Sequence, residues 1–295
     1  MTQPCLLLLS AICFTLSSGE VIGKERLAPT YKDVAYDDED PAQCLDFYRA
    51  KSEDPVPVIV HIHGGGWHAG SKSNVPAYLL RAVEAGWVSV ASVEYRFTNV
   101  ATHPAQGNDC LRSVQFVRTK ASEWNLDPLR IGVTGGSAGG HLSLWVALHD
   151  DVADAKSADP VERESSRVLC AVGFAGPTDW SLLEEIEHQH PGYLQLIDSK
   201  PGTPFAQIDK AKMDDVSPVF HASSDDPSIL IVHGDADVIV PFAHAERLNA
   251  ALGKAKVKTE LYTVEGGNHG VAGAGEKGSA ARATAFFKEH LLLTE

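Results

Sequence analysis

The stretch Gly-Gly-Ser-Ala-Gly at residues 135–139 constrains the fold of this chain more than any other. The apolar run at 130–134 before it predicts a buried strand, and residues 141–148 after it predict a helix. A sharp turn between the two needs small residues, because glycine accepts backbone angles and close approaches that a side chain forbids. Such a turn presents the Ser137 hydroxyl at the carboxyl end of a sheet, beside the free N–H groups of a helix N-terminus. The alternative is a glycine-rich turn with an incidental serine.

Apolar runs alternate with helical patterns along the chain. The runs that predict strands are residues 31–36, 43–49, 56–63, 87–94, 130–134, 168–174, 228–233 and 257–264. The patterns that predict helices are residues 75–85, 106–124, 141–148, a stretch that ends at 252, and 276–292. Polarity alternates along the first two strands, which predicts an antiparallel pair. The whole pattern predicts an α/β fold with a mostly parallel sheet of about eight strands and helices on both faces.

Two irregular stretches interrupt this alternation. Residues 150–167 are polar and charged, which predicts a surface excursion. Residues 180–227 are rich in proline, acidic residues and histidine, and are long for a simple connection. We expect short helices there that cover the sheet edge and shape a pocket. Because 44% of the 295 residues are hydrophobic, the chain can build a large core, and we expect one domain over residues 20–295.

The first nineteen residues contain no charged side chain. Residues 5–16 form an apolar stretch of signal-peptide length, too short to span a bilayer, and small residues follow at 17–19. Although the usual basic start is missing, we expect a signal peptide at residues 1–19 and a secreted or periplasmic protein. An N-terminus that is never cleaved is the alternative. The formal net charge of −14 argues against nucleic acid or an anionic membrane as a partner.

The cysteines and histidines give little support for a metal site. After cleavage the chain would keep Cys44, Cys110 and Cys170, an odd number without CxxC spacing. Buried thiols are the expected state, and one disulfide after export is the alternative. His61 and His63 would point to one face of a regular strand, but no third ligand lies nearby in the sequence. We therefore expect no metal and no organic cofactor.

Four chemically distinctive segments follow predicted strands. His-Gly-Gly-Gly-Trp at 63–67 follows one strand, and its consecutive glycines let the backbone turn N–H groups towards a ligand. Ser137, Asp237 and His269 each follow another strand, in the order serine, acid, histidine. Because the carboxyl ends of parallel strands meet at one edge, this pattern predicts nucleophile, base and orienting carboxylate together, facing oxyanion donors.

The segments HGGGW, GGSAGGHL, HGDADVIVP and GGNHG together resemble α/β-hydrolases of the esterase/lipase group. The chain is similar to carboxylesterases, including the hormone-sensitive-lipase type and feruloyl-esterase-like bacterial enzymes, over residues 31–292. The resemblance implies that Ser137 is the nucleophile, His269 the general base and then general acid, and Asp237 the residue that orients the imidazole. It also implies an oxyanion hole whose donors are the N–H groups of Gly65, Gly66 and Ala138.

Several positions have competitors. Asp235 could replace Asp237 as the acid, but the family's motif selects Asp237 and leaves Asp235 as a turn residue that caps local N–H groups. His269 is favoured because it lies in a glycine-rich loop after the last strand, whereas the histidines on expected helices are assigned to packing or solvent: His141, His244 and His290. Trp67 either lines the pocket or packs the glycine loop against the core.

The sequence therefore predicts a serine carboxylesterase that hydrolyses short-chain, carbohydrate-linked or aromatic esters through an acyl-enzyme. Its partner would be a small-molecule or polysaccharide-linked ester, and stable membrane insertion is not expected. An amidase or peptidase on the same fold is the first alternative, and a non-catalytic binding protein is the second. Nothing in the sequence indicates an oligomeric state.

Overall fold

The computed structural model describes residues 26–185, 191–272 and 278–292. Eight strands in these ranges form one sheet, in the order β1-β2-β4-β3-β5-β6-β7-β8. The strands are β1 (Tyr31–Ala35), β2 (Cys44–Tyr48), β3 (Val56–Ile62), β4 (Ser89–Val93), β5 (Leu126–Gly136), β6 (Cys170–Phe174), β7 (Ser228–Gly234) and β8 (Thr259–Val264). β2 runs antiparallel to β1 and β4, and all other neighbouring strands are parallel. The expected mostly parallel sheet and its antiparallel first pair are confirmed, whereas the expected signal peptide lies outside the described residues.

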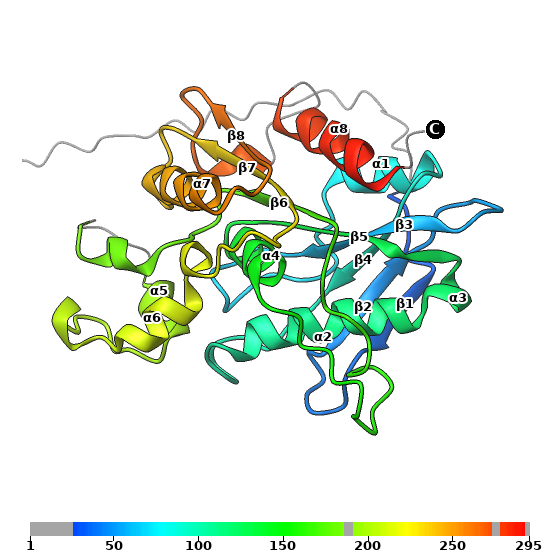
Figure 1. The fold of residues 1–295 in the computed structure, drawn as a ribbon, viewed down its shortest axis with the longest axis horizontal. Helices are drawn as coiled ribbons and strands as arrows, with labels where there is room; N and C mark the ends of the chain where they lie inside the picture. The colour runs from blue at the N-terminus through cyan, green and yellow to red at the C-terminus, as the bar shows by residue number, and fades with distance from the viewer. Residues whose placement is uncertain (1–25, 186–190, 273–277, 293–295) are drawn as a thin grey trace, which may run out of the picture.

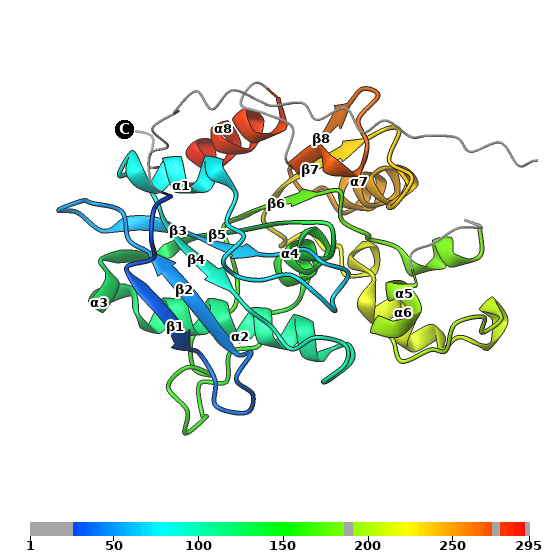
Figure 2. The same cartoon turned by 180° about the vertical axis from the view of Figure 1, so that it is seen from behind.

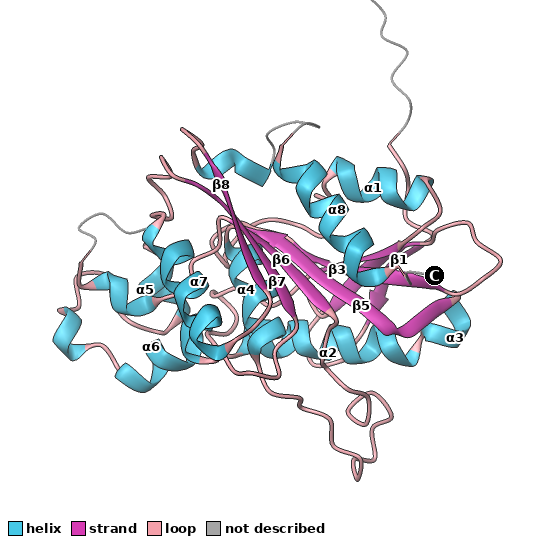
Figure 3. Cartoon of the chain, turned by 45° about the horizontal axis from the view of Figure 1, so that its top comes forward, coloured by secondary structure: helices cyan, strands magenta, loops and turns pink. Residues whose placement is uncertain are grey.

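Helices cover both faces of the sheet, as expected. The α-helices are α1 (Ala77–Glu84), α2 (Ala105–Thr119), α3 (Ala121–Trp124), α4 (Ala138–Leu148), α5 (Gly192–Leu196), α6 (Lys210–Val216), α7 (Ala243–Ala255) and α8 (Ser279–Leu291). The 3₁₀ helices are η1 (Trp180–Leu183), η2 (Phe205–Gln207), η3 (Pro218–Phe220) and η4 (His269–Ala272). Figure 3 shows α1 and α8 on one face, with α2, α4 and α7 on the other. The sheet is thus the middle of three layers.

The strands are buried on both faces because side chains alternate across a strand. In β3, Val58, Val60 and Ile62 pack into the cluster that contains the apolar residues of α2 and α4. Ile59 points the other way, into the cluster formed with α1 and α8. All seven residues of β3 are buried. This explains why the central strands are continuous apolar runs rather than alternating ones.

The helix expected at residues 106–124 is in fact two helices, α2 and α3. The break lies at Lys120, whose N–H is shared between the carbonyls of Phe116 and Val117. α3 then ends at Asn125 in the left-handed conformation, with φ of 57°. β5 begins at Leu126, earlier than expected, because Leu126 pairs with Val56 before the register shifts. The apolar pattern could not show this irregular first part of the strand.

The two irregular stretches contain no strand in their described parts. Residues 150–167 contain no helix or strand. Residues 180–227 contain only short helices in their described part, and Figures 1 and 2 place α5 and α6 on the side of the molecule that carries α7. Two hydrogen bonds fasten α6 to α4: Trp145 Nε1 donates to the carbonyl of Asp215 at 2.7 Å, and His141 Nε2 lies 2.8 Å from that of Val216.

The three cysteines in the described ranges carry free thiols. Cys110 and Cys170 are fully buried, and burial raises the pKa of both thiols. The expectation of buried thiols is therefore confirmed for these two, whereas Cys44 is only half-buried. In the part of the chain that is described, no helix is both long and apolar enough to cross a membrane.

Candidate active site

Ser137 lies at the turn between β5 and α4, with φ of 57° and ψ of −123°. This conformation is strained for a residue with a side chain, and it exposes the hydroxyl above the end of the sheet. The neighbouring backbone is close: a Cβ at Gly139 would lie 2.1 Å from the carbonyl oxygen of Ile62. The need for small residues around the serine is therefore confirmed, and β5, β3 and α4 together fix its position.

The structure brings Ser137, His269 and Asp237 together although 132 residues separate the first two. His269 Nε2 lies 2.9 Å from Ser137 Oγ, and His269 Nδ1 lies 2.8 Å from Asp237 Oδ2. Each residue follows the carboxyl end of a parallel strand, namely β5, β7 or β8. The result is one continuous row of hydrogen bonds from carboxylate to imidazole to hydroxyl.

The Asp237 carboxylate is held by donors on both oxygens. Oδ1 accepts the N–H groups of Ile239 and Val240 at 2.9 and 3.0 Å, and His233 Nε2 lies 3.4 Å from Oδ2. Burial raises the pKa of the Asp237 carboxyl, but the hydrogen bonds from the two imidazoles and the two backbone groups outweigh it and hold this pKa well below its usual range. The carboxylate therefore stays ionised and can stabilise a charge on His269.

The glycine loop after β3 faces Ser137. Gly65 and Gly66 have φ of 125° and 60°, values that glycine adopts without strain. Ala138 is the first residue of α4, so its N–H has no partner inside the helix. The backbone N–H groups of these three residues make no hydrogen bond to any described residue. All three residues line the cavity that holds Ser137, which makes their N–H groups available to a developing negative charge.

His63 anchors this loop to the residues that follow β4. Its Nε2 lies 2.5 Å from Glu94 Oε1, and its Nδ1 lies 2.8 Å from the carbonyl oxygen of Gly64. The other oxygen of Glu94 accepts the N–H of Lys72 at 3.2 Å. The ring also stacks on Tyr95, with centroids 4.5 Å apart. His61 instead contacts Ser92 Oγ at 2.9 Å, and no metal-binding cluster of three ligands occurs among the described residues.

A cavity of about 420 Å³ opens over Ser137. Its lining combines the glycine loop and the reactive side chains with apolar groups from other elements, including Trp67, Pro177, Tyr193, Ile239 and Val240. Trp67 fills both roles that the sequence left open. It lines the cavity, and it is 2% exposed with Nε1 donating to His141 Nδ1 at 3.1 Å.

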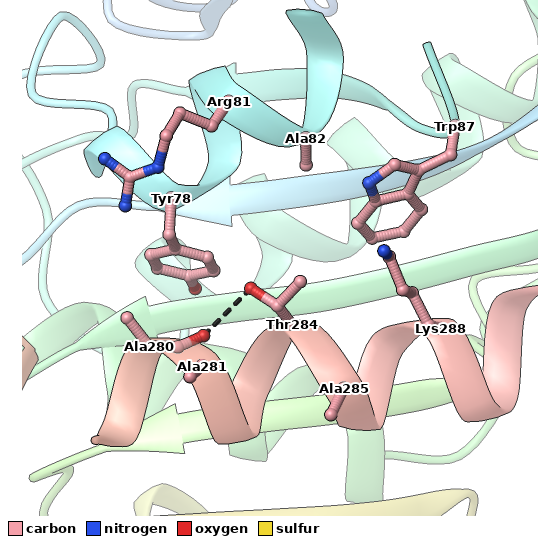
Figure 4. A pocket seen from close by; sticks show the side chains of 9 residues that line it. All are labelled: Tyr78, Arg81, Ala82, Trp87, Ala280, Ala281, Thr284, Ala285 and Lys288. Carbon is pink, nitrogen blue, oxygen red and sulfur yellow. Dashed lines mark hydrogen bonds between the residues drawn. The ribbon is translucent and has the colours of Figure 1, made fainter. Parts of the chain in front are cut away.

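A larger cavity, of about 520 Å³, lies between α1 and α8. Figure 4 shows Lys288 reaching towards the ring of Trp87, while Arg81 and Tyr78 project from α1. The Lys288 ammonium lies 5.4 Å from the centroid of the Trp87 ring. No serine, cysteine, histidine or carboxylate is among the residues that line this cavity, so it holds no set of serine, histidine and acid. The cavity over Ser137 is therefore the candidate active site.

The competing residues have other structural roles. Asp235 Oδ1 accepts the N–H of Gly266 at 2.6 Å, a capping role as expected. His141 and His244 are fully buried in packing contacts, and His290 Nδ1 lies 2.9 Å from the carbonyl oxygen of Phe286. The sequence interpretation missed His233 beside Asp237, although His233 stands in the same motif. It also missed Tyr193, which no pattern in the irregular stretch singles out.

Comparisons with known proteins find ester hydrolases among the proteins that this chain resembles. The probable carboxylic ester hydrolase LipM of Mycobacterium tuberculosis is 34% identical over 217 residues, which are 72% of this chain and 49% of LipM. The chain thus spans about half the length of that relative. A truncated carbohydrate esterase from gut microbiota superposes with a TM-score of 0.77 and 27% identity, covering 92% of this chain and 99% of that chain.

A second solved structure is that of an acetyl ester-xyloside bifunctional hydrolase from Caldicellulosiruptor lactoaceticus. It has a TM-score of 0.69 and 30% identity, and 84% of each chain is covered. Both structures share the arrangement of strands and helices described above, which confirms the expected fold. Residues 45–252, more than half of the chain, match the BD-FAE family. The chain therefore belongs to the BD-FAE family of α/β-hydrolases.

Proposed function

We propose that this chain is a serine carboxylesterase that works through an acyl-enzyme. The observation that carries the proposal is the row of two hydrogen bonds, at 2.9 and 2.8 Å, that links Ser137 to His269 and His269 to Asp237. Loop N–H groups without a described acceptor face the same cavity. A hydroxyl, a base, an oriented carboxylate and oxyanion donors are the groups that acyl transfer by serine requires.

In the first half of the reaction, Ser137 Oγ attacks the ester carbonyl carbon while its proton passes to His269 Nε2. The carbonyl oxygen becomes an oxyanion that accepts hydrogen bonds from the N–H groups of Gly65, Gly66 and Ala138. Asp237 stabilises the imidazolium. When the intermediate collapses, the bond to the alcohol oxygen breaks, His269 returns the proton to that oxygen, and the acyl group stays on Ser137.

In the second half, water replaces the alcohol. His269 takes a proton from the water, whose oxygen attacks the acyl carbon, and the proton then returns to Ser137 Oγ as the carboxylic acid leaves. The N–H donors serve both intermediates. No metal or organic cofactor enters either half of the proposed reaction.

The proposed substrates are short-chain esters, including esters linked to carbohydrate or to an aromatic group. A cavity of about 420 Å³ suits a small acyl group and part of an alcohol. Two solved relatives support the carbohydrate option, since one is described as a carbohydrate esterase and the other as an acetyl ester-xyloside hydrolase. Secretion or export to a periplasm stays a prediction that depends on residues 1–19.

Replacing the nucleophile tests the proposal. We expect wild-type protein to hydrolyse p-nitrophenyl acetate and butyrate, and Ser137→Ala to lose roughly 10⁴-fold or more in kcat. Ser157→Ala, in the loop at 150–167, is the matched control and should retain full activity. A fluorophosphonate probe should label the wild type and not Ser137→Ala. Absence of labelling in the wild type would favour a non-catalytic binding protein, and activity that survives Ser137→Ala would overturn the assignment.

A further inference from the structure

Tyr193 on α5 is a buried hydrogen-bonding residue that the proposed reaction does not use. It lines the cavity over Ser137 and is 1% exposed. Its ring packs against both Trp67 and Trp180, with centroid distances of 5.9 and 5.1 Å. Its hydroxyl lies 3.3 Å from His244 Nε2. Neighbours on several sides therefore fix both the ring and the position of the hydroxyl.

The direction of the hydrogen bond between Tyr193 and His244 follows from the other side of the imidazole. His244 Nδ1 lies 3.1 Å from the N–H nitrogen of Thr178 and 3.2 Å from that of Asp179. A backbone N–H can only donate, so Nδ1 must accept and carries no proton. Burial lowers the pKa of His244 to about 3, which keeps the ring neutral. The single proton of the ring is therefore on Nε2, and Nε2 donates to Tyr193 Oη.

Because Tyr193 Oη accepts the hydrogen bond from His244, the hydrogen of the Tyr193 hydroxyl is still available to an acceptor. Among the described residues, His244 is the one hydrogen-bond partner of Tyr193 Oη, and it acts as the donor. Burial, reinforced by the nearby Asp237 carboxylate, raises the pKa of Tyr193, so the hydroxyl keeps its proton and remains a donor. Tyr193 lines the same cavity as Ser137 and His269, so this donor belongs to a residue beside the reactive groups.

The surroundings of the Tyr193 hydroxyl make this donor selective for a substrate oxygen. Trp67 donates its N–H to His141 and Trp180 donates its N–H to the carbonyl oxygen of Tyr193, so both indole donors are already used. Apolar side chains, including Pro177 and Val240, line the cavity beside Tyr193. A fixed donor in such surroundings gains a hydrogen bond from a substrate oxygen and is left unsatisfied by a hydrocarbon group. An oxygen and a methylene group of a substrate would therefore differ in binding free energy beside this donor.

We propose that Tyr193 is a specificity-determining residue whose Oη–H donates to a substrate oxygen other than the ester carbonyl, so that the site prefers esters with a hydroxyl, ether or carbonyl oxygen near the reacting bond. His244 is the positioning residue that sets the direction of this donation. The inference rests on the proposed esterase function and deepens it by naming the chemistry of the substrate. Acylated sugars and oxygen-substituted acyl groups both belong to this class.

Isosteric substrate pairs test the proposal. On the acyl side, p-nitrophenyl methoxyacetate and p-nitrophenyl butyrate differ by one oxygen in place of a methylene group. On the alcohol side, 2-methoxyethyl acetate and butyl acetate differ in the same way. We compare kcat/KM for each pair in the wild type, in Tyr193→Phe and in Tyr78→Phe. Tyr78 is a buried tyrosine between α1 and α8, where its hydroxyl lies 3.4 Å from Thr134 Oγ1.

For at least one pair, we expect Tyr193→Phe to reduce the preference for the oxygen-containing ester by roughly three- to twelvefold. Tyr78→Phe should leave both preferences unchanged. Because each variant is compared with the wild type on the same substrates, differences in intrinsic ester reactivity cancel. Thermal unfolding of each variant separates this effect from a loss of folded protein.

An equal effect of Tyr193→Phe on both members of both pairs would overturn the proposal, since the hydroxyl would then bind water or serve packing alone. Failure of the esterase assignment looks different, because the wild type would then hydrolyse none of the four esters. A preference that is lost on the acyl pair alone, or on the alcohol pair alone, supports the proposal and identifies the side on which the oxygen binds.

Discussion

Two aspartates two residues apart have different environments. Asp237 is 6% exposed and accepts hydrogen bonds from His269 and from two backbone N–H groups. Asp235 is exposed and accepts one N–H, that of Gly266. Their charges are equal, so a difference in their importance for activity reflects these environments, and Asp237 is the one of the two that contacts the imidazole of His269.

Replacing each aspartate by asparagine therefore makes a matched comparison. We expect Asp237→Asn to reduce kcat roughly 10⁴-fold, because an amide neither fixes the useful tautomer of His269 nor stabilises its charge. Asp235→Asn should stay within about threefold of the wild type, because an amide oxygen can still accept the N–H of Gly266. The measurement is kcat on p-nitrophenyl acetate. Similar losses in both variants would point to loop stability and contradict a specific role for Asp237.

The sequence could predict that Ser137, Asp237 and His269 lie close together because each follows a strand. The carboxyl ends of parallel strands meet at one edge of the sheet, whatever conformation the loops adopt. The sequence could not place Tyr193. That residue comes from a five-residue helix inside a long irregular stretch, and its position depends on packing against Trp67 and Trp180. Local periodicity contains no information about such long-range contacts. Substrate selectivity is therefore less predictable from sequence than the reactive groups.

At the scale of elements, the glycine loop after β3 needs support because its own residues contribute no side chains. That support comes from the ends of two parallel strands: His63 follows β3, and Glu94 follows β4. Each ring nitrogen of His63 faces an acceptor oxygen, one from Glu94 and one from Gly64. Glu94 also accepts the N–H of Lys72, so it ties both sides of the loop to the sheet.

Removing this anchor should impair the transition state more than substrate binding. We expect Glu94→Ala to lower kcat roughly ten- to hundredfold with a smaller change in KM, because displaced N–H donors stabilise the oxyanion poorly. Glu94→Gln should recover part of the loss, since its amide oxygen can still accept from His63. Glu123→Ala, on the exposed end of α3, is the control. A rise in KM with kcat unchanged, or equal losses in both Glu94 variants, would contradict a role in positioning the loop.

The boundaries of helices and strands were less predictable from the sequence than the central strands themselves. The central strands were predictable because burial on both faces leaves continuous apolar runs. The break between α2 and α3 was not, since it depends on a shared hydrogen bond at Lys120 rather than on polarity. The first residues of β5 were missed for the same kind of reason, because their pairing with Val56 is followed by a register shift.

At the scale of the whole molecule, three of the buried histidines lie in different parts of the core: His61 on β3, His141 on α4 and His244 on α7. Burial is the main cause that lowers the pKa of each imidazole to about 3. In the unfolded chain the same groups bind a proton near pH 6.5. Between these two values the unfolded state holds more protons, so the free energy of unfolding falls as the pH falls.

This difference in proton binding predicts that acid destabilises the folded state. We expect the free energy of unfolding to decrease from about pH 6.5 downwards, with a limiting slope of about 1.4 kcal/mol per pH unit for each of these three histidines. Net charge predicts the opposite over the same range, because the protein approaches its pI of about 5.3 and self-repulsion declines. Urea unfolding at pH 7.5, 6.5, 5.5 and 5.0 separates the two effects. His61→Leu should reduce the slope by about 1.4 kcal/mol per pH unit, the contribution of one bound proton. A free energy of unfolding that stays constant or rises towards pH 5 would show that the buried neutral histidines do not control the stability in acid.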